Sequence, residues 1–360
     1  MLHRAVGRPS VQIDVGMRIG PFEASDNASG SGGARQVVVG GGMVSREREY
    51  EEYEGDQEYE EDEAEPATAQ AWHNHSLAHI LPLKQAIQEM VRDGDVVALE
   101  GFTHLIPFAA GHEIIRQGRR NLTLVRMTPD LIYDQLIGSG CASKLIFSWG
   151  GNPGVGSLHR LRDAVEQGWP APLELEENAH AGMAAAYAAG ASHLPFGILR
   201  GYLGTDLPKY NRVKFIECPF TGEKLAAIPA IRPDVTVIHA QKADRKGNVL
   251  MWGVVGVQKE AVLAAQRVVV TVEEIVDVLD APPNAVVLPS WVVGAVSEVK
   301  GGAFPSYAQG YYARNNAFYK AWDPIARERE TFQAWMQRHV LSTKDFDEFK
   351  RSLEQVVTHA

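Results

Sequence analysis

Cysteine is scarce in this chain: among 360 residues only Cys141 and Cys218 are cysteines, and they do not form a CxxC pair. A disulfide framework needs more thiols than this, and a structural zinc site needs several Cys or His ligands at short spacing. The sequence therefore predicts no disulfide scaffold and no metal site. We expect both thiols to be buried and unreactive.

Long apolar runs are also missing. A membrane-spanning helix requires roughly 18 consecutive apolar residues, and charged residues interrupt even the rich stretch VVVTVEEIVDVL. The opening stretch MLHRAVGRPSVQIDVG contains arginine but no apolar core and no small-residue cleavage site, so it does not resemble a secretory signal. We expect a cytoplasmic protein without a membrane segment.

Positive charge is not in excess in the chain as a whole, which has 35 Lys and Arg against 45 Asp and Glu. The formal net charge is −10, and residues 46–65, which hold 12 acids and two arginines, account for all of it. The remainder is neutral overall, so it offers no basic stripe for nucleic acid and no basic helix for an anionic membrane. Neither partner is expected.

The sequence lacks the common motifs of nucleotide-binding proteins, of serine hydrolases and of zinc metalloproteases. The Gly-rich stretch WGGNPGVGS lacks the Gly-Lys-Ser/Thr end of a P-loop and the spacing of the dinucleotide motif GxGxxG. No GxSxG elbow and no HExxH motif is found. The sequence thus predicts no cofactor of either kind.

Composition divides the chain into three parts. Residues 1–76 are rich in Gly and Ser and then in Glu, and their small apolar content predicts a disordered tail. The acidic stretch is either a partner-binding tail or a solvated extension without a role of its own. We interpret residues 77–315 as an α/β domain, and residues 316–360 as a charged helical extension of that domain.

Short β-branched runs alternate with helical segments after residue 80. The predicted strands are 96–102, 122–127, 144–150, 196–201, 235–240 and 267–272. The predicted helices are 82–94, 109–118, 128–140, 157–168, 178–190 and 258–266, of which TPDL and SLHR offer N-caps and several end in Gly. This order predicts an open, mostly parallel sheet with helices on both faces.

Two Gly-containing loops follow predicted strands, where α/β sheets place their ligands. In EGFTHLIPF, Gly101 and Phe102 could present backbone N–H groups to an oxyanion. In WGGNPGVGS, an anion or thioester could be bound by the residues Gly150, Gly151, Asn152 and Gly154. Both loops are also compatible with simple turns that let a helix pack on a strand.

A third loop, EENAHAGM, brings Glu177 close to His180 in the sequence. A carboxylate beside an imidazole can perform acid–base or nucleophilic chemistry. The same residues also suit the first turn and cap of a helix. The remaining histidines are isolated, and we expect them to be surface residues or hydrogen-bonded core residues.

Several motifs in order resemble the A subunit of family I coenzyme A transferases of the glutaconate type. They cover residues 80–350 and are DGDVVALEGF, LPF, CPFTGEKLAAIPA, DVTVIHAQKADRKGNV, VVVTVEEIV and GGAFPSY. The resemblance implies the open α/β fold, assembly with a homologous B subunit, and transfer of CoA from an acyl-CoA to a carboxylic acid, expected to be dicarboxylic or a 3-oxo acid. CoA would be a carrier substrate and not a resident cofactor.

In that family a glutamate attacks the acyl-CoA, forming an anhydride and then a glutamyl-CoA thioester. The resemblance places this glutamate in a Ser-Glu-Asn-Gly motif of the B subunit, and this chain contains no such motif. Gly101 and Phe102 match the family's oxyanion turn, whereas Glu100 stands where the family usually has Gly.

Two alternatives to the transferase remain open. The chain could belong to an acyl-CoA hydrolase or ring-opening enzyme of the same family, with Glu177 as its catalytic residue. It could also be a non-catalytic sensor that binds a sugar phosphate.

Overall fold

The computed structural model describes residues 78–357. The predicted disordered tail and its acidic stretch lie outside the described residues. The helices run over α1 Leu83–Met90, α2 Phe108–Arg116, α3 Leu131–Gly138, α4 His159–Gln167, α5 His180–Ala191, α6 Gln258–Ala264, α7 Asn316–Arg327, α8 Arg329–Met336 and α9 Phe346–Val357.

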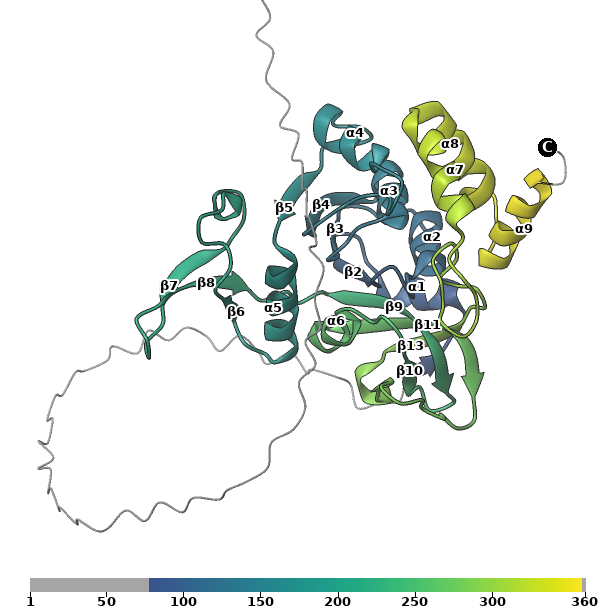
Figure 1. Cartoon of the computed structure of the whole chain (residues 1–360). Helices are drawn as coiled ribbons and strands as arrows, with labels where there is room; N and C mark the ends of the chain where they lie inside the picture. The colour runs from purple at the N-terminus through teal and green to yellow at the C-terminus, as the bar shows by residue number, and fades with distance from the viewer. Residues whose placement is uncertain (1–77, 358–360) are drawn as a thin grey trace, which may run out of the picture. The chain divides into compact units, whose positions relative to one another are not determined.

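In the described part of the chain, ten strands form one open sheet (Figure 1). They are β1 His79–Ile80, β2 Val96–Glu100, β3 Leu122–Val125, β4 Ala142–Phe147, β5 Glu174–Glu177, β9 Val235–Asp244, β10 Val249–Met251, β11 Arg267–Val276, β12 Val286–Leu288 and β13 Ala295–Glu298. The order β1-β13-β11-β9-β2-β3-β4-β5 is parallel throughout. β10 pairs antiparallel with β9 and β12.

Both faces of this sheet are buried, because successive side chains of its strands pack against helices on opposite sides. In β2, Val97 and Leu99 pack in a core cluster with residues of α1–α4 and of the C-terminal helices α7–α9. Ala98 points to the other face and packs with residues of α5 and α6. Because successive strand residues face opposite sides, apolar runs such as VVAL indicate a sheet covered on both faces. The predicted fold class is confirmed, and the C-terminal helices are present.

The predicted strand 196–201 does not join the parallel sheet. It forms β6, Phe196–Leu199, which pairs antiparallel with β8, Lys224–Pro229; β7, Lys214–Glu217, pairs on the other side of β8. This small sheet packs on α5, where a Cβ at Gly197 would lie 2.5 Å from the Ala185 carbonyl oxygen. A single apolar run cannot reveal which sheet its strand joins, so the prediction was right about the strand and wrong about its partners.

Two local predictions need correction. The cap expected at SLHR is wrong, because α4 begins after Leu158 and has no side-chain cap; in contrast, Asp130 caps α3 by accepting from the Ile132 N–H. Cys141 is buried, and burial raises the pKa of its thiol to about 12. Cys218 is only half-buried, so the expectation that both thiols are buried is wrong for this residue.

Candidate functional site

The carboxyl ends of β2, β3 and β4 lie side by side, because these strands are parallel neighbours (Figure 1). The loops that follow them, 101–107, 126–130 and 148–158, therefore meet at one edge of the sheet. This edge is where open α/β folds place their ligands.

The turn after β2 depends on a glycine. A Cβ at Gly101 would lie 2.8 Å from the Leu105 carbonyl oxygen and 2.9 Å from that of His104, so a larger residue would push the turn apart. Thr103 and Leu105 have φ values of 60° and 53°, in the region that L side chains rarely adopt. The turn is thus compact and strained, and it presents Phe102 and Thr103 at the sheet edge.

Arg126, directly after β3, connects this turn to the next loop. Its Nη2 donates to the Gly101 carbonyl oxygen at 2.7 Å, and its Nη1 forms an ion pair with Asp130 Oδ1 at 2.8 Å. Both side chains of the pair are almost completely buried. A buried arginine requires such a partner, so its charge is neutralised within the protein.

The Gly-rich loop after β4 is held by its own backbone and by helix α7. The Asn152 N–H donates to the Gly156 carbonyl oxygen at 2.8 Å, and the Asn152 side-chain amide donates to the Tyr319 carbonyl oxygen at 2.7 Å. Gly154 has a φ of 76°. The Gly151 N–H donates to the Pro129 carbonyl oxygen at 3.2 Å, which joins this loop to the loop after β3.

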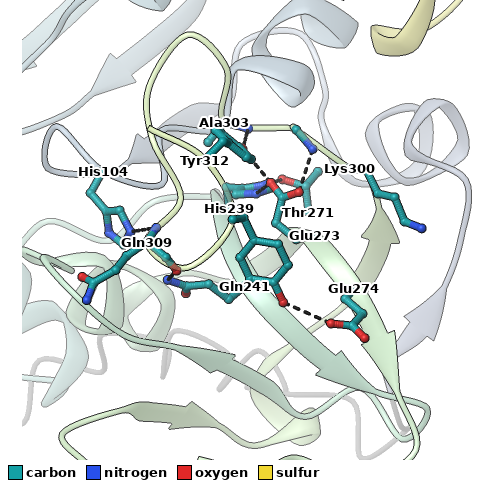
Figure 2. Close-up of polar contacts among 12 residues, drawn as sticks. His104, His239, Gln241, Thr271, Glu273, Glu274, Lys300, Ala303, Gln309 and Tyr312 are labelled. Atoms are coloured by element: carbon teal, nitrogen blue, oxygen red, sulfur yellow. Dashed lines mark hydrogen bonds and ion pairs between the residues drawn. The ribbon is translucent and has the colours of Figure 1, made fainter. Parts of the chain in front are cut away.

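The segment 301–312 is held against β9 and β11 by a buried carboxylate (Figure 2). Glu273 Oε1 accepts from the Tyr312 hydroxyl at 2.6 Å and lies 2.7 Å from His239 Nε2, while Glu273 Oε2 accepts from the Gly301 N–H at 2.7 Å. The Tyr312 hydroxyl also accepts from the Ala303 N–H at 3.0 Å. These bonds fasten the segment 301–312 to the sheet.

These loops enclose a pocket of about 360 Å³. Its walls carry three aromatic side chains (Phe, Trp and Tyr), two arginines, one aspartate and one histidine. The lining residues are Phe102, Thr103, Arg126, Thr128, Asp130, Trp149, Pro153, His180, Arg314 and Tyr319.

The predicted loop residues fall on or directly behind this pocket. Phe102 lines it, with Gly101 behind the wall. Trp149 and Pro153 also line it, so the loop that contains Gly150, Gly151, Asn152 and Gly154 forms one wall. The structure thus brings the first two Gly-containing loops together.

Glu177 and His180 are both exposed, but they do not line the pocket together. Glu177 ends β5 and is exposed, and it is not among the pocket-lining residues, whereas His180 begins α5 and lines the pocket. The idea that this segment caps a helix fails too, because α5 begins after Ala179 without a side-chain cap. Asn178 instead accepts from the Tyr202 hydroxyl at 3.2 Å.

Glu100 turns away from the pocket into the core. Its Oε1 accepts from the Tyr187 hydroxyl at 2.8 Å and from the Met127 N–H at 3.1 Å. Burial raises the pKa of Glu100 to about 7, against the opposing positive charge of Arg126 and these two hydrogen bonds. Glu100, which stands where the family usually has Gly, therefore does not enter the pocket.

Two of the isolated histidines are hydrogen-bonded core residues, as expected. His104 lies 3.1 Å from the Val254 carbonyl oxygen and accepts from the Gln309 N–H at 2.9 Å; burial lowers its pKa to about 4. His112 lies 2.8 Å from Gln135 Oε1, and burial lowers its pKa to about 3. Both imidazoles are neutral at physiological pH.

Sequence reasoning missed several polar residues of the pocket, among them Arg126, Arg314 and Tyr319. Arg126 follows the strand LTLV directly, so its position at a strand end was a usable signal. Tyr319 comes from residues 316–360, which we interpreted as a helical extension, and Arg314 lies just before it, at the end of the predicted α/β domain. No local pattern connects that segment to the ends of β2–β4.

Two features are absent from the described residues. Residues 78–357 contain no group of three or more His, Cys, Asp or Glu side chains that could hold a metal ion. Over the same range, no helix is both long and apolar enough to cross a membrane.

Comparison with known proteins decides the family. A family model described as coenzyme A transferase matches residues 81–299, which is more than half of the chain. The chain belongs to the coenzyme A transferase family. The resemblance seen in the motifs is therefore confirmed. The matched range ends before Arg314 and Tyr319.

Relatives within this coenzyme A transferase family are themselves parts of larger enzymes. The chain is 67% identical over 280 residues to the A subunit of 3-oxoadipate CoA-transferase from Pseudomonas knackmussii, covering 78% of this chain and 99% of the relative. It is 33% identical to the A subunit of glutaconate CoA-transferase from Acidaminococcus fermentans, over 77% of this chain and 92% of the relative. The crystal structure of glutaconate coenzyme A-transferase from the same organism matches with a TM-score of 0.72 at 32% identity, covering 78% of this chain and 94% of that one.

Proposed function

We propose that this chain is the A subunit of a CoA transferase that moves CoA between an acyl-CoA and a dicarboxylic 3-oxo acid, and that a homologous B subunit supplies the catalytic glutamate. The observation that carries this proposal is the 67% identity to the A subunit of a 3-oxoadipate CoA-transferase, along 99% of that relative.

The acidic groups of the pocket support the need for a partner. Asp130 is the one carboxylate among the pocket-lining residues, and its Oδ1 is engaged by Arg126. Glu177 is exposed and lies outside the lining. A nucleophile must reach the thioester carbonyl within about 3–3.5 Å, and a group tied up in a buried ion pair is poorly suited to that role. The attacking carboxylate is therefore assigned to the other subunit.

The proposed reaction proceeds through two covalent intermediates on that glutamate. Its carboxylate attacks the thioester carbonyl, and the C–S bond breaks, which gives an acyl–glutamyl anhydride and CoA thiolate. The thiolate then attacks the glutamyl carbonyl of the anhydride and releases the first acid as a carboxylate, leaving a glutamyl-CoA thioester. The acceptor acid repeats these steps in reverse order and leaves as its CoA ester.

The contribution of this chain is to bind and orient. Each attack places negative charge on a carbonyl oxygen, and backbone N–H groups aimed at that oxygen would stabilise it. We assign this role to the compact turn at Gly101 and Phe102. The loop with Gly150, Gly151 and Gly154 would form the wall that receives the acid. The Asn152 amide is committed to Tyr319, so it is assigned to holding this wall in place.

The test is a transfer assay with the chain and a B subunit produced together. With succinyl-CoA as donor and 3-oxoadipate as acceptor, we expect the pair to form 3-oxoadipyl-CoA and neither protein to be active by itself. Mass spectrometry of the pair incubated with acyl-CoA should find CoA attached to the B subunit.

Glu177→Gln separates the transferase from the hydrolase alternative. We expect this variant to keep its transfer rate, since Glu177 does not line the pocket. The proposal would be wrong if the pair transferred CoA to no carboxylic acid, or if CoA became attached to this chain. Release of free CoA without an acceptor, abolished in Glu177→Gln, would establish the hydrolase instead.

A further inference from the structure

The charges of the pocket do not cancel. Arg126 and Asp130 form a buried pair of zero net charge. Arg314 is the other arginine in the lining, and within residues 78–357 no carboxylate lies within ion-pair distance of it. The pocket therefore has one half-buried guanidinium that forms no ion pair with the described residues, although its positive charge acts on Asp130 in the same lining.

Neutral groups hold this guanidinium in place. Arg314 Nη1 donates to Asn316 Oδ1 at 2.7 Å, and Nη2 donates to the Pro153 carbonyl oxygen at 2.9 Å. Its Cζ lies 3.8 Å from the centre of the Tyr319 ring. A guanidinium has five N–H donors, so these contacts orient it and leave donor capacity for a further acceptor.

The backbone around Arg314 is fixed on both sides. Two residues earlier, the Tyr312 hydroxyl donates to the buried Glu273 (Figure 2). One residue later, Asn315 caps α7 by accepting from the Phe318 N–H at 3.0 Å, and its own N–H donates to the Pro305 carbonyl oxygen at 3.0 Å. The cation is thus preorganised at the pocket wall, which lowers the cost of binding an anion there.

We propose that Arg314 binds the non-reacting carboxylate of the acceptor acid and so makes the pocket selective for dicarboxylic over monocarboxylic acids. This inference rests on the proposed function. The planar fork of a guanidinium matches a carboxylate, and such charge-assisted pairs are among the strong hydrogen bonds of proteins. The rings of Phe102 and Trp149 provide apolar walls for the carbon chain between the two carboxylates.

CoA phosphates are the other source of anionic oxygens in this reaction. The pocket volume of about 360 Å³ lies near the lower end of the range for small-molecule sites, roughly 300–1,000 Å³. That size suits a six-carbon acid and is small for a molecule as large as CoA. We therefore assign Arg314 to the acid, and the experiment below distinguishes the two sources.

Steady-state kinetics of the two-subunit enzyme test this assignment with two acceptors, 3-oxoadipate and 3-oxohexanoate. They share a six-carbon 3-oxo chain, and the second lacks the remote carboxylate. We expect Arg314→Gln to lower kcat/KM for 3-oxoadipate about 10- to 100-fold, the size of a lost charged hydrogen bond, and to leave 3-oxohexanoate nearly unchanged. Arg314→Lys should recover part of the loss, because it keeps the charge without the fork.

The matched control is Arg245→Gln, which removes an exposed arginine that pairs with Asp277 at the protein surface. It should change neither acceptor. Equal losses for both acids in Arg314→Gln, or no loss, would overturn the assignment, and a rise confined to the KM of the acyl-CoA would indicate CoA phosphate recognition. Absence of transfer to either acid by the unaltered enzyme would overturn the proposed function and this inference with it.

A binding measurement covers the case that Arg314→Gln does not fold. Adipate should raise the Tm of the unaltered two-subunit enzyme, because a ligand that binds the folded state stabilises it. Hexanoate at equal concentration should raise it much less. Equal shifts for the two acids would overturn the proposed selectivity.

Discussion

Two buried glutamates on either side of strand β9 differ in their ionisation. Glu100 ends β2 and Glu273 lies in β11, and both side chains are nearly inaccessible, with 3% and 4% of their surface exposed. Burial raises the pKa of Glu100 to about 7. Burial would also raise the pKa of Glu273, but hydrogen bonds from His239, Gly301 and Tyr312 lower it below its ordinary value.

The partners of the two carboxyl groups contribute to this difference. The hydrogen bonds of Glu100, from Tyr187 and Met127, meet at its Oε1. Glu273 receives bonds at both oxygens. Donors to the charged form favour ionisation, and desolvation opposes it. Burial therefore leaves Glu100 with a raised pKa, whereas the donors around Glu273 lower the pKa of that carboxyl group.

Each glutamate adjoins or holds a segment that leads to a pocket-lining residue. Glu100 precedes the turn 101–107, and Glu273 holds the segment 301–312, which leads to Arg314. The two acids should consequently respond to pH in opposite directions. Glu273, with its lowered pKa, stabilises the fold above its unfolded value of 4.5, and that contribution is lost as pH falls through the folded pKa. The contribution of Glu100 is present below 4.5 and is lost as pH rises through about 7.

The largest effect should come from Glu273→Gln. The amide places an N–H₂ group where the carboxylate accepted from three donors, so at least one buried donor loses its partner. We expect the free energy of unfolding at pH 7 to fall by about 3 kcal/mol, measured by urea denaturation.

Glu274→Gln is the matched control one residue along. Glu274 is 45% exposed and pairs at the surface with Lys242 and Tyr311, so its replacement should cost less than about 0.5 kcal/mol. A loss in Glu273→Gln as small as in this control would show that the network does not hold the loop.

The sequence was most informative where burial on both faces gives a continuous apolar run. Strands β2, β9 and β11 were predicted for this reason. Strand β5 was missed because three of its four residues are glutamates. Two of these charges are compensated, since Lys144 pairs with Glu174 and Glu176, and Arg212 pairs with Glu176. Only the folded arrangement shows that compensation.

The candidate site also has a part that the sequence predicts and a part that only the structure shows. The Gly-containing loops were predictable because each directly follows a strand, and the carboxyl ends of the parallel strands β2, β3 and β4 lie at one edge of the sheet. The pairing of Glu100 with Tyr187 spans 87 residues, and the contact from Arg314 to Pro153 spans 161. No periodicity or spacing encodes such contacts, so the ionisation of Glu100 and the position of Arg314 required the structure.

A smaller effect is expected for Glu100→Gln, and it should appear as a change in pH dependence. At pH 5 the glutamine resembles the neutral acid, so the variant should be close to the parent in stability. Between pH 5 and pH 8 the parent should lose about 2 kcal/mol that the variant retains, because the unfolded chain releases this proton near 4.5 and the folded chain near 7.

The measurement is the urea midpoint of both proteins at each pH. Parallel stability curves for parent and variant would mean that Glu100 is ionised in the folded state across this range. In that case the two glutamates would not differ, and the contrast drawn from their partners would fail.

The smallest effect concerns a single donor of the Glu273 network. Tyr312→Phe removes the hydroxyl that donates to Glu273 and accepts from the Ala303 N–H. A hydrogen bond to a charged group contributes about 1.5–3 kcal/mol, and we expect a loss near the lower limit because His239 and Gly301 still bind the carboxylate. Tyr311→Phe removes a hydroxyl that donates to Glu274 from a half-exposed ring, and it should cost less than about 0.5 kcal/mol.

The same variant of Tyr312 should affect acid binding. Since Tyr312 lies two residues before Arg314, its loss should also raise the KM for 3-oxoadipate more than that for 3-oxohexanoate. A Tyr312 variant that lost stability with no such difference would separate the network from acid binding.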